Sequence, residues 1–252
     1  KTFKNMNLNS TAAIVLAAGR GTRMKAKKKN KVAFNLHGKP MVAHTVDNLI
    51  ESGVAQIIAV VGFAAESVKE ALGDSVDYAT QSEPLGTGHA LKAALPHLAQ
   101  GIDTVLTVYG DDSAFYPVSL YQEMVQELRD KKCDLLFLTI HKDDPTGLGR
   151  IVRSQSGDIE RIVEEKNATD EERKIQEINT GFYCFDRSFL EQYIDQIQKN
   201  PLTGEYYATD MVEIALRNQK KVSAYFRPDS SIWHGVNNRS DYSRAQKKAN
   251  NA

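Results

Sequence analysis

The chain has 252 residues, enough to bury a substantial core, and we expect one integrated domain because no Pro/Gly/Ser-rich linker divides it. Lys and Arg number 32 together, and so do Asp and Glu, so the net charge gives no reason to expect nucleic acid or a membrane as a partner. The only two cysteines, Cys133 and Cys184, lie in or beside apolar segments, which predicts reduced core thiols in a cytoplasmic protein and argues against a disulfide framework.

The first expected element is a strand that follows a short polar segment. Residues 1–11 form a polar N-terminal extension, and we expect the domain itself to span residues 12–238. The apolar run 12–18 is too short to cross a membrane, and a small-residue cleavage site does not follow it. We therefore interpret this run as a buried strand.

A glycine-rich loop follows this strand directly and reads Gly19-Arg20-Gly21-Thr22-Arg23. Backbone N–H groups in such a loop can surround a nucleoside triphosphate while the arginines neutralise its charge. The loop is not a Walker motif, because it lacks the terminal Gly-Lys-Ser/Thr. It is not a dinucleotide fingerprint either, because the third glycine is absent. A tight turn without a ligand is the alternative interpretation.

Strand-like and helix-like segments then alternate, which is typical of a mostly parallel sheet with helices on both faces. We therefore predict the α/β class with a Rossmann-like sheet. Short apolar or β-rich runs predict buried strands, and periodic stretches between them predict helices. The expected strands of this half are 13–17, 56–61, 104–109 and 135–139, and the expected helices are 41–52, 88–98 and 118–131.

After about residue 145 the pattern changes to short strands joined by turns such as Ser156-Gly157-Asp158. We expect these strands to be antiparallel and to wall one side of a cleft. Ser188 and Glu191 form a capping-box pattern that predicts a helix over 189–198. The expected strands of this half are 150–153, 159–163, 177–185 and 222–226, and residues 239–252 form a polar terminal helix or tail.

Two charged positions in the first half are candidates for phosphate chemistry. Lys31 can neutralise a triphosphate beside the glycine loop, although a solvated lysine in a basic run is the alternative. Asp111 follows the strand 104–109 at its carboxyl end, where ligands collect in doubly wound sheets. A carboxylate there can hold Mg²⁺, which needs only one or two carboxylates in addition to substrate phosphates. A turn-forming aspartate is the alternative.

The segment 81–90 reads Gln-Ser-Glu-Pro-Leu-Gly-Thr-Gly-His-Ala and is suited to a flat base. Glycines let the backbone approach the base, and the Gln81 amide can both donate to and accept from the O4/N3 edge of uracil. If the nucleophile is a phosphate monoester, it is already ionised near pH 7, and His89 is then not needed as a general base. We expect His89 to pack or bond locally.

Together these motifs resemble the sugar-nucleotide pyrophosphorylases, which join a sugar 1-phosphate to a nucleoside triphosphate. The resemblance extends from about Ala12 to Arg239 and is greatest to the N-acetylglucosamine-1-phosphate uridylyltransferases, the domain found in a bifunctional enzyme that makes the cell-wall precursor UDP-N-acetylglucosamine. It rests on the glycine loop and on the segments Lys31-Val32, Gly38-Lys39-Pro40, Leu-Gly-Thr-Gly-His (85–89) and Glu-Ile-Asn-Thr-Gly (177–181). The hexapeptide repeats of that enzyme's acetyltransferase domain do not occur in this sequence, so acetylation is not expected.

The resemblance implies a role for each matching residue, with UTP and N-acetyl-α-D-glucosamine 1-phosphate as substrates and Mg²⁺ as cofactor. Arg23 and Lys31 would stabilise charge during transfer. Asp111 and Asn237 would bind the metal. The implied nucleotide-binding residues are Leu16, Ala17, Gly19, Gly21, Thr22, Gln81, Gly86, Thr87 and Tyr109, and the implied sugar-binding residues are Gly149, Glu164, Asn179, Tyr207 and Thr209.

Two departures from the family pattern leave alternatives open. Asp112-Ser113-Ala114 replaces the usual Val-Pro-Leu after Gly-Asp and adds a carboxylate beside the expected metal site. Pro84 replaces a usual glutamine near the expected base site. The alternatives are the same chemistry on glucose 1-phosphate or another hexose 1-phosphate, and a non-catalytic sensor of nucleotide sugars.

Overall fold

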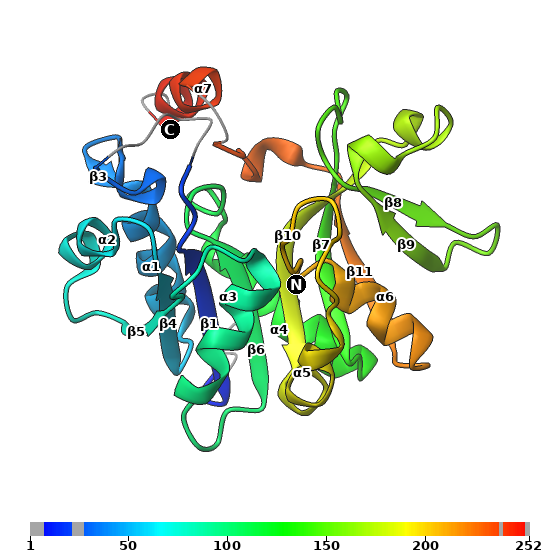
Figure 1. Ribbon diagram of the computed structural model, residues 1–252, viewed down its shortest axis with the longest axis horizontal. Helices are drawn as coiled ribbons and strands as arrows, with labels where there is room; N and C mark the ends of the chain where they lie inside the picture. The colour runs from blue at the N-terminus through cyan, green and yellow to red at the C-terminus, as the bar shows by residue number, and fades with distance from the viewer. Residues whose placement is uncertain (1–7, 22–27, 237–238, 250–252) are drawn as a thin grey trace.

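The computed structural model describes residues 8–21, 28–236 and 239–249. Within them a nine-stranded mixed sheet runs through the molecule, with helices on both faces (Figure 1). Its main path is β11-β7-β10-β6-β1-β4-β5, and β8 and β9 branch from β10. The strands are β1 (Thr11–Ala17), β4 (Gln56–Val61), β5 (Asp77–Thr80), β6 (Thr104–Tyr109), β7 (Leu135–His141), β8 (Arg150–Arg153), β9 (Ile159–Val163), β10 (Glu177–Asp186) and β11 (Val222–Arg227).

The sheet is parallel on one side and mixed on the other. Strand β1 pairs in parallel with β4 and β6, and β4 pairs in parallel with β5. Strand β10 is antiparallel to β6, β7 and β8, and β8 is antiparallel to β9. The predicted α/β class and the predicted antiparallel addition in the second half are confirmed. A separate short ribbon pairs β2 (Asn35–Leu36) with β3 (Lys39–Pro40).

Helices cover the sheet in two groups because successive side chains of a strand point to opposite faces. Ala13, Val15 and Ala17 of β1 pack in the cluster that includes α1 (Met41–Ser52), α2 (Ala65–Leu72) and α4 (Val118–Lys131). Ala12, Ile14 and Leu16 pack in the cluster that includes α3 (Thr87–Ala94), α5 (Arg187–Tyr193) and α6 (Asp210–Arg217). Burial on both faces explains why β1 is apolar at every position after Thr11.

Most predicted elements agree with the structure to within a residue or two at each end, including α1, α4, β4, β6, β8 and β9. Helix α1 ends at Ser52 and is capped by Gly53, whose left-handed φ of 84° suits glycine. The expected helix 88–98 divides into α3 and a 3-10 turn at Leu95–His97. Cys133 and Cys184 are free and buried, as predicted.

The predicted capping box at Ser188 is wrong. Asp186 caps α5 by accepting a hydrogen bond from the Phe189 backbone N–H at 3.1 Å, so the helix begins at Arg187 and ends at Tyr193. The Ser188 hydroxyl donates to the same Asp186 carboxylate. Aspartate is as good a cap as serine, and here it stands at the end of β10, where the chain first leaves the sheet.

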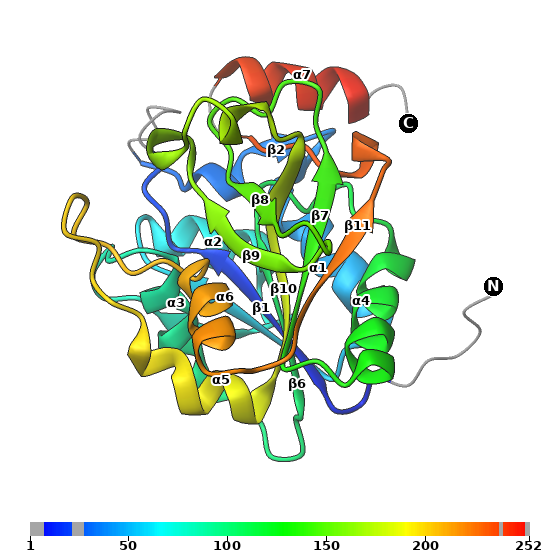
Figure 2. The same ribbon diagram turned by 90° about the vertical axis from the view of Figure 1, so that its right-hand side faces the viewer.

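Two groups of segments face each other at one end of the sheet. The carboxyl ends of β1 and β6 lie on one side, with α3 next to them, and the β8–β9 hairpin lies on the other. Figure 2 shows this hairpin beside α6, on the outer side of β10. Helix α7 (Arg239–Ala249) packs over the β2–β3 ribbon. The described helices all lack the length and hydrophobicity that crossing a membrane requires.

Candidate active site

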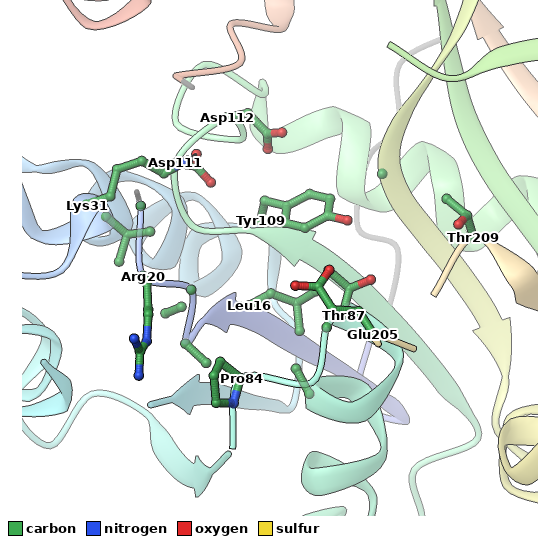
Figure 3. Close-up of a pocket in the computed structure, with 18 of the residues that line it drawn as sticks. Leu16, Arg20, Lys31, Pro84, Thr87, Tyr109, Asp111, Asp112, Glu205 and Thr209 are labelled. Atoms are coloured by element: carbon green, nitrogen blue, oxygen red, sulfur yellow. Dashed lines mark ion pairs between the residues drawn. The ribbon is translucent and has the colours of Figure 1, made fainter. Parts of the chain in front are cut away.

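A pocket of about 510 Å³ opens between these two parts of the sheet (Figure 3). Its walls combine segments from the ends of β1 and β6, the start of α3, the β8–β9 hairpin and the middle of β10. Thr22, Arg23 and Asn237, which the sequence also singled out, lie outside the described residues. The predicted site residues that line the pocket are Leu16, Ala17, Gly19, Gly21, Lys31, Gln81, Gly86, Thr87, Tyr109, Asp111, Gly149, Glu164, Asn179 and Thr209.

The start of the glycine loop is held against Lys31 by close packing. Gly21 has a φ of +56°, and a Cβ there would stand 2.9 Å from the Cβ of Lys31, so a larger residue fits neither the backbone nor the space. The buried Asn30 amide donates to the carbonyl oxygens of Ala17 and Phe63 at 2.9 and 2.8 Å. Local sequence pattern does not reveal this role, because a lone asparagine in a basic run is typical of an exposed loop.

Lys31 and Asp111 form an ion pair inside the pocket, with only 16% and 11% of their side chains exposed. Lys31 starts a 3-10 turn, Lys31–Ala33, whereas Asp111 follows β6. Figure 3 shows the Lys31 side chain extending towards Asp111. The structure thus brings together the lysine expected to neutralise phosphate charge and the carboxylate expected to bind metal.

Asp112 adds a second carboxyl group to this end of the pocket. Burial raises the pKa of Asp112 well above its ordinary value, the negative charge of Asp111 raises it further, and Lys31 opposes both. Ser113 fixes the loop, because its hydroxyl donates to the Tyr109 carbonyl and lies 2.9 Å from the buried Thr45 hydroxyl. Ser113, one of the residues that depart from the family pattern, therefore bonds within the core.

The residues at this position fit a Mg²⁺ ion. Two neighbouring carboxyl groups share one described cation, Lys31, and this excess of negative charge is part of what disfavours ionised Asp112. Within the described residues no group of three or more His, Cys, Asp and Glu is arranged to hold a metal. A sparse set of oxygen donors is what Mg²⁺ uses when phosphates complete its coordination.

The expected base-binding segment is closed by its own hydrogen bonds. The Gln81 amide donates to the Gly86 carbonyl at 2.9 Å and to Nδ1 of His89 at 3.1 Å. His89 therefore bonds locally, as predicted. Gly86 has a φ of +94°, and a Cβ there would lie 2.5 Å from the Tyr206 carbonyl oxygen. The Thr87 hydroxyl accepts from the Ala208 N–H at 2.9 Å, which ties the start of α3 to the segment before α6.

The expected sugar-binding residues converge from the hairpin and β10. The Asn179 backbone N–H donates to the Gly149 carbonyl at 2.9 Å, and its side-chain amide donates to the Tyr183 hydroxyl at 2.6 Å. Burial raises the pKa of Glu164, which Lys166 and Arg150 oppose. Tyr207 is the exception: it does not line the pocket, and its hydroxyl donates to Thr203 Oγ1 at 2.7 Å.

Several further residues line the pocket although the sequence does not single them out: Asn30, Leu148, Thr180, Gly181, Glu205 and Trp233. Gly181 offers a readable signal, because a glycine inside a strand often marks a bulge or a close approach. Here the register of β10 against β7 shifts between Asn179 and Tyr183. A Cβ at Gly181 would stand 2.1 Å from the ring of Tyr109, so this glycine makes room for a pocket residue.

Comparisons with known proteins agree with this geometry. A family model described as nucleotidyl transferase matches residues 12–252. Proteins named bifunctional protein GlmU match 93% of the chain, with 44% identity in Exiguobacterium sibiricum, 43% in Geobacillus thermodenitrificans and 41% in Bacillus subtilis. The chain spans 52% of the Exiguobacterium protein and 51% of the other two, about half the length of these relatives.

The fold also matches a solved structure. A crystal structure from Bacillus anthracis, described as a glucose-1-phosphate thymidylyltransferase, aligns with a TM-score of 0.78 over 96% of each chain, at 22% sequence identity. At that identity the likeness concerns the fold.

Proposed function

Because the chain belongs to the nucleotidyl transferase family, we propose that this nucleotidyltransferase joins UTP and N-acetyl-α-D-glucosamine 1-phosphate to give UDP-N-acetylglucosamine and pyrophosphate. One observation carries the proposal. A single pocket is lined by the expected nucleotide-binding, charge-stabilising and sugar-binding segments, which lie far apart in the sequence. The identity of 41–44% with bifunctional GlmU proteins supports the same activity.

The main obstacle to this reaction is charge repulsion, since an anionic sugar phosphate must approach the α-phosphorus of a triphosphate. Lys31, together with the backbone N–H groups at Gly19 and Gly21, stands where it would neutralise the phosphates. Asp111 with Asn237 would hold Mg²⁺, which when bound neutralises phosphate charge and orients the triphosphate. Asp111 pairs with Lys31 in this structure, and with a cation held at Asp111 the Lys31 ammonium would be available to phosphate oxygens.

Positioning replaces acid–base chemistry in the proposed mechanism. An oxygen of the sugar phosphate attacks the α-phosphorus in line, and the bond to the leaving pyrophosphate breaks. The nucleophile is already an anion near pH 7, so it needs no general base. The position of His89 is consistent with a mechanism that uses no general base, because its Nδ1 accepts from Gln81 and His89 does not line the pocket.

The sugar assignment rests on the polar wall opposite the nucleotide loop. Glu164, Asn179 and Thr209 supply acceptors and donors that suit a sugar rich in hydroxyl groups. The Gly149 N–H would add one donor. A pocket gains limited energy from one small substituent, so we expect the N-acetyl group to be favoured over a hydroxyl by about 1–3 kcal/mol.

Pyrophosphate release with Mg²⁺ tests the proposal across a panel of nucleoside triphosphates and sugar 1-phosphates. The expected result is the highest kcat/KM for UTP paired with N-acetylglucosamine 1-phosphate. A higher kcat/KM for glucose 1-phosphate would replace the sugar and keep the nucleotidyl transfer. Tight UTP binding without turnover on any sugar phosphate would overturn the enzymatic assignment.

A further inference from the structure

The sugar side of the pocket is carried by a hairpin whose open end faces the ligand. Strand β8 begins at Arg150, directly after Gly149, and β9 ends at Val163, directly before Glu164. Arg150 and Val163 are register partners, so Gly149 and Glu164 stand opposite each other just beyond the last paired residues. The ends of a strand pair are its weakest part, and some other contact must fix their separation.

Gly149 is held to β10 by the hydrogen bond from the Asn179 N–H, and an ion pair across the open end links the two sides of the hairpin itself. Arg150 is almost completely buried, with 2% of its side chain exposed, and its guanidinium pairs with the carboxylate of Glu165, which is 32% exposed. Glu165 Oε2 also accepts from the Gly147 N–H at 3.0 Å, and Nη1 of Arg150 donates to the Leu148 carbonyl at 2.5 Å. The pair therefore joins the residues after β9 to the turn that leads into β8.

The ion pair acts on the neighbours of both partners. Gly149 lies between Leu148 and Arg150, which are bonded to each other, and Glu164 is covalently linked to Glu165. The two expected sugar-binding residues also approach closely, because a Cβ at Gly149 would stand 3.3 Å from Glu164 Oε1. Neither Arg150 nor Glu165 lines the pocket, so any effect on the ligand passes through their neighbours.

We propose that Arg150 and Glu165 are positioning residues that clamp the open end of the β8–β9 hairpin and hold Gly149 and Glu164 at the spacing a bound sugar requires. This inference rests on the proposed function, because it takes these two residues as contacts of the sugar. A short displacement of a binding group is enough to weaken recognition severely, which gives a buried clamp a direct effect on the ligand.

The same hairpin offers a matched control. Arg153, at the far end of β8, donates to Glu177 at 2.8 and 2.7 Å, and neither residue lines the pocket. This pair also joins the hairpin to β10, but it lies away from Gly149 and Glu164 along the strand. Loss of general hairpin stability would therefore affect variants of Arg150 and Arg153 alike, whereas loss of positioning would affect only the former.

The experiment compares the affinities for UDP and UDP-N-acetylglucosamine by isothermal titration, because their ratio isolates the contribution of the sugar. Arg150→Met and Glu165→Gln are expected to reduce this ratio by roughly tenfold or more relative to the unmodified chain. The affinity for UDP itself should change by less than about twofold, since the nucleotide half is untouched. Arg153→Met should leave both values unchanged, and Arg150→Lys should restore part of the ratio by keeping the charge.

The possible results separate failure of the clamp from failure of the proposed function. If the unmodified chain favours UDP-N-acetylglucosamine over UDP and both clamp variants keep that preference, the clamp is refuted while the proposed function stands. If the unmodified chain shows no preference for the sugar-bearing product, the sugar assignment fails and the clamp's role fails with it. Should Arg150→Met unfold, Glu165→Gln still decides, because Glu165 is partly exposed and Arg150 keeps its bond to the Leu148 carbonyl.

Discussion

The two walls of the pocket are built by different means. The nucleotide wall consists of strand ends and loops with little room for change: the loop at Gly21 and the turn at Gly86 both have positive φ and both would clash with a Cβ. The expected sugar wall combines part of β10 with the β8–β9 hairpin, and in the hairpin the buried Arg150 pairs with Glu165 across the open end. Steric constraints tolerate few substitutions, whereas polar contacts can be exchanged, so specificity should change more easily at the sugar wall.

The Lys31–Asp111 pair lies beside the glycine loop, and in the proposed reaction both substrates would depend on it. Asp111→Ala should lower kcat by roughly 10²-fold or more, because the expected metal loses its main carboxylate. Pyrophosphate release measured over a range of Mg²⁺ concentrations checks this, with Asp112→Ala as the comparison. A greater loss for Asp112→Ala would move the metal ligand to that position and would make the departure from the family pattern a functional one.

Substitution of a constrained glycine tests the nucleotide wall. Gly86→Ala should destabilise the fold by about 3 kcal/mol or more, because left-handed strain adds to a clash with the Tyr206 carbonyl, and it should raise the KM for UTP. Gly101→Ala is the control: its φ is +86°, yet no atom lies within 4 Å of the added Cβ. It should cost about 1 kcal/mol, with no change in KM.

Chemical unfolding gives both free energies, and steady-state kinetics gives the KM values. Equal effects of the two substitutions would mean that backbone strain alone matters, and the nucleotide wall would then lack the steric rigidity that distinguishes it from the sugar wall.

The sugar wall should respond selectively instead. Glu164→Ala removes a carboxylate that lines the pocket, so the KM for the sugar phosphate should rise by a factor equivalent to about 1–3 kcal/mol while the KM for UTP stays nearly constant. Glu160→Ala on the exposed side of β9 is the control and should leave both unchanged. Equal increases in both KM values would show that the two walls are coupled and not independent.

The features that could be predicted from the sequence are those that leave a pattern in consecutive residues. The strand β1, the helix α1 and the glycine loop follow from local pattern, because buried strands and glycine loops leave their signal in consecutive residues. Most of the predicted lining residues of the nucleotide wall are instead implied by the family resemblance. Helix α2, strand β5 and helix α6 were missed. Strand β5 is short and partly exposed, and the residues just before α6, Tyr207 and Thr209, are singled out only as expected sugar-binding residues.

Individual contacts between distant segments could not be predicted from local pattern. The hydrogen bond from Asn30 to Phe63 joins residues 33 positions apart, and the clamp joins a strand start to a residue beyond the next strand. Charge and size alone do not select such partners, because many arginines and glutamates in this chain could have paired differently. Only the fold, which sets the register of β8 with β9, decides that Arg150 meets Glu165.

The smallest expected effect concerns Asp210, which starts α6 beside the sugar wall. Burial, and then the charges of Glu213 and Glu164, raise the pKa of Asp210 to about 6. Because an unfolded aspartate ionises near pH 3.9, the folded state binds more protons than the unfolded state between about pH 4 and 6. The contribution of Asp210 to the free energy of unfolding therefore falls as the pH rises through that window, and it stays lower at higher pH.

Asp210→Asn should remove this penalty. The variant should match the unmodified chain near pH 4 and exceed it by about 1–2 kcal/mol at pH 8, a value below the full shift because Asp210 is partly exposed. Urea unfolding at both pH values measures the difference. Glu213→Gln removes one cause of the raised pKa, so in that background the gain from Asp210→Asn should shrink. A gain of equal size at pH 4 and pH 8 would mean that packing, and not charge, distinguishes the variant, and the carboxylates beside the sugar wall would then carry no electrostatic cost.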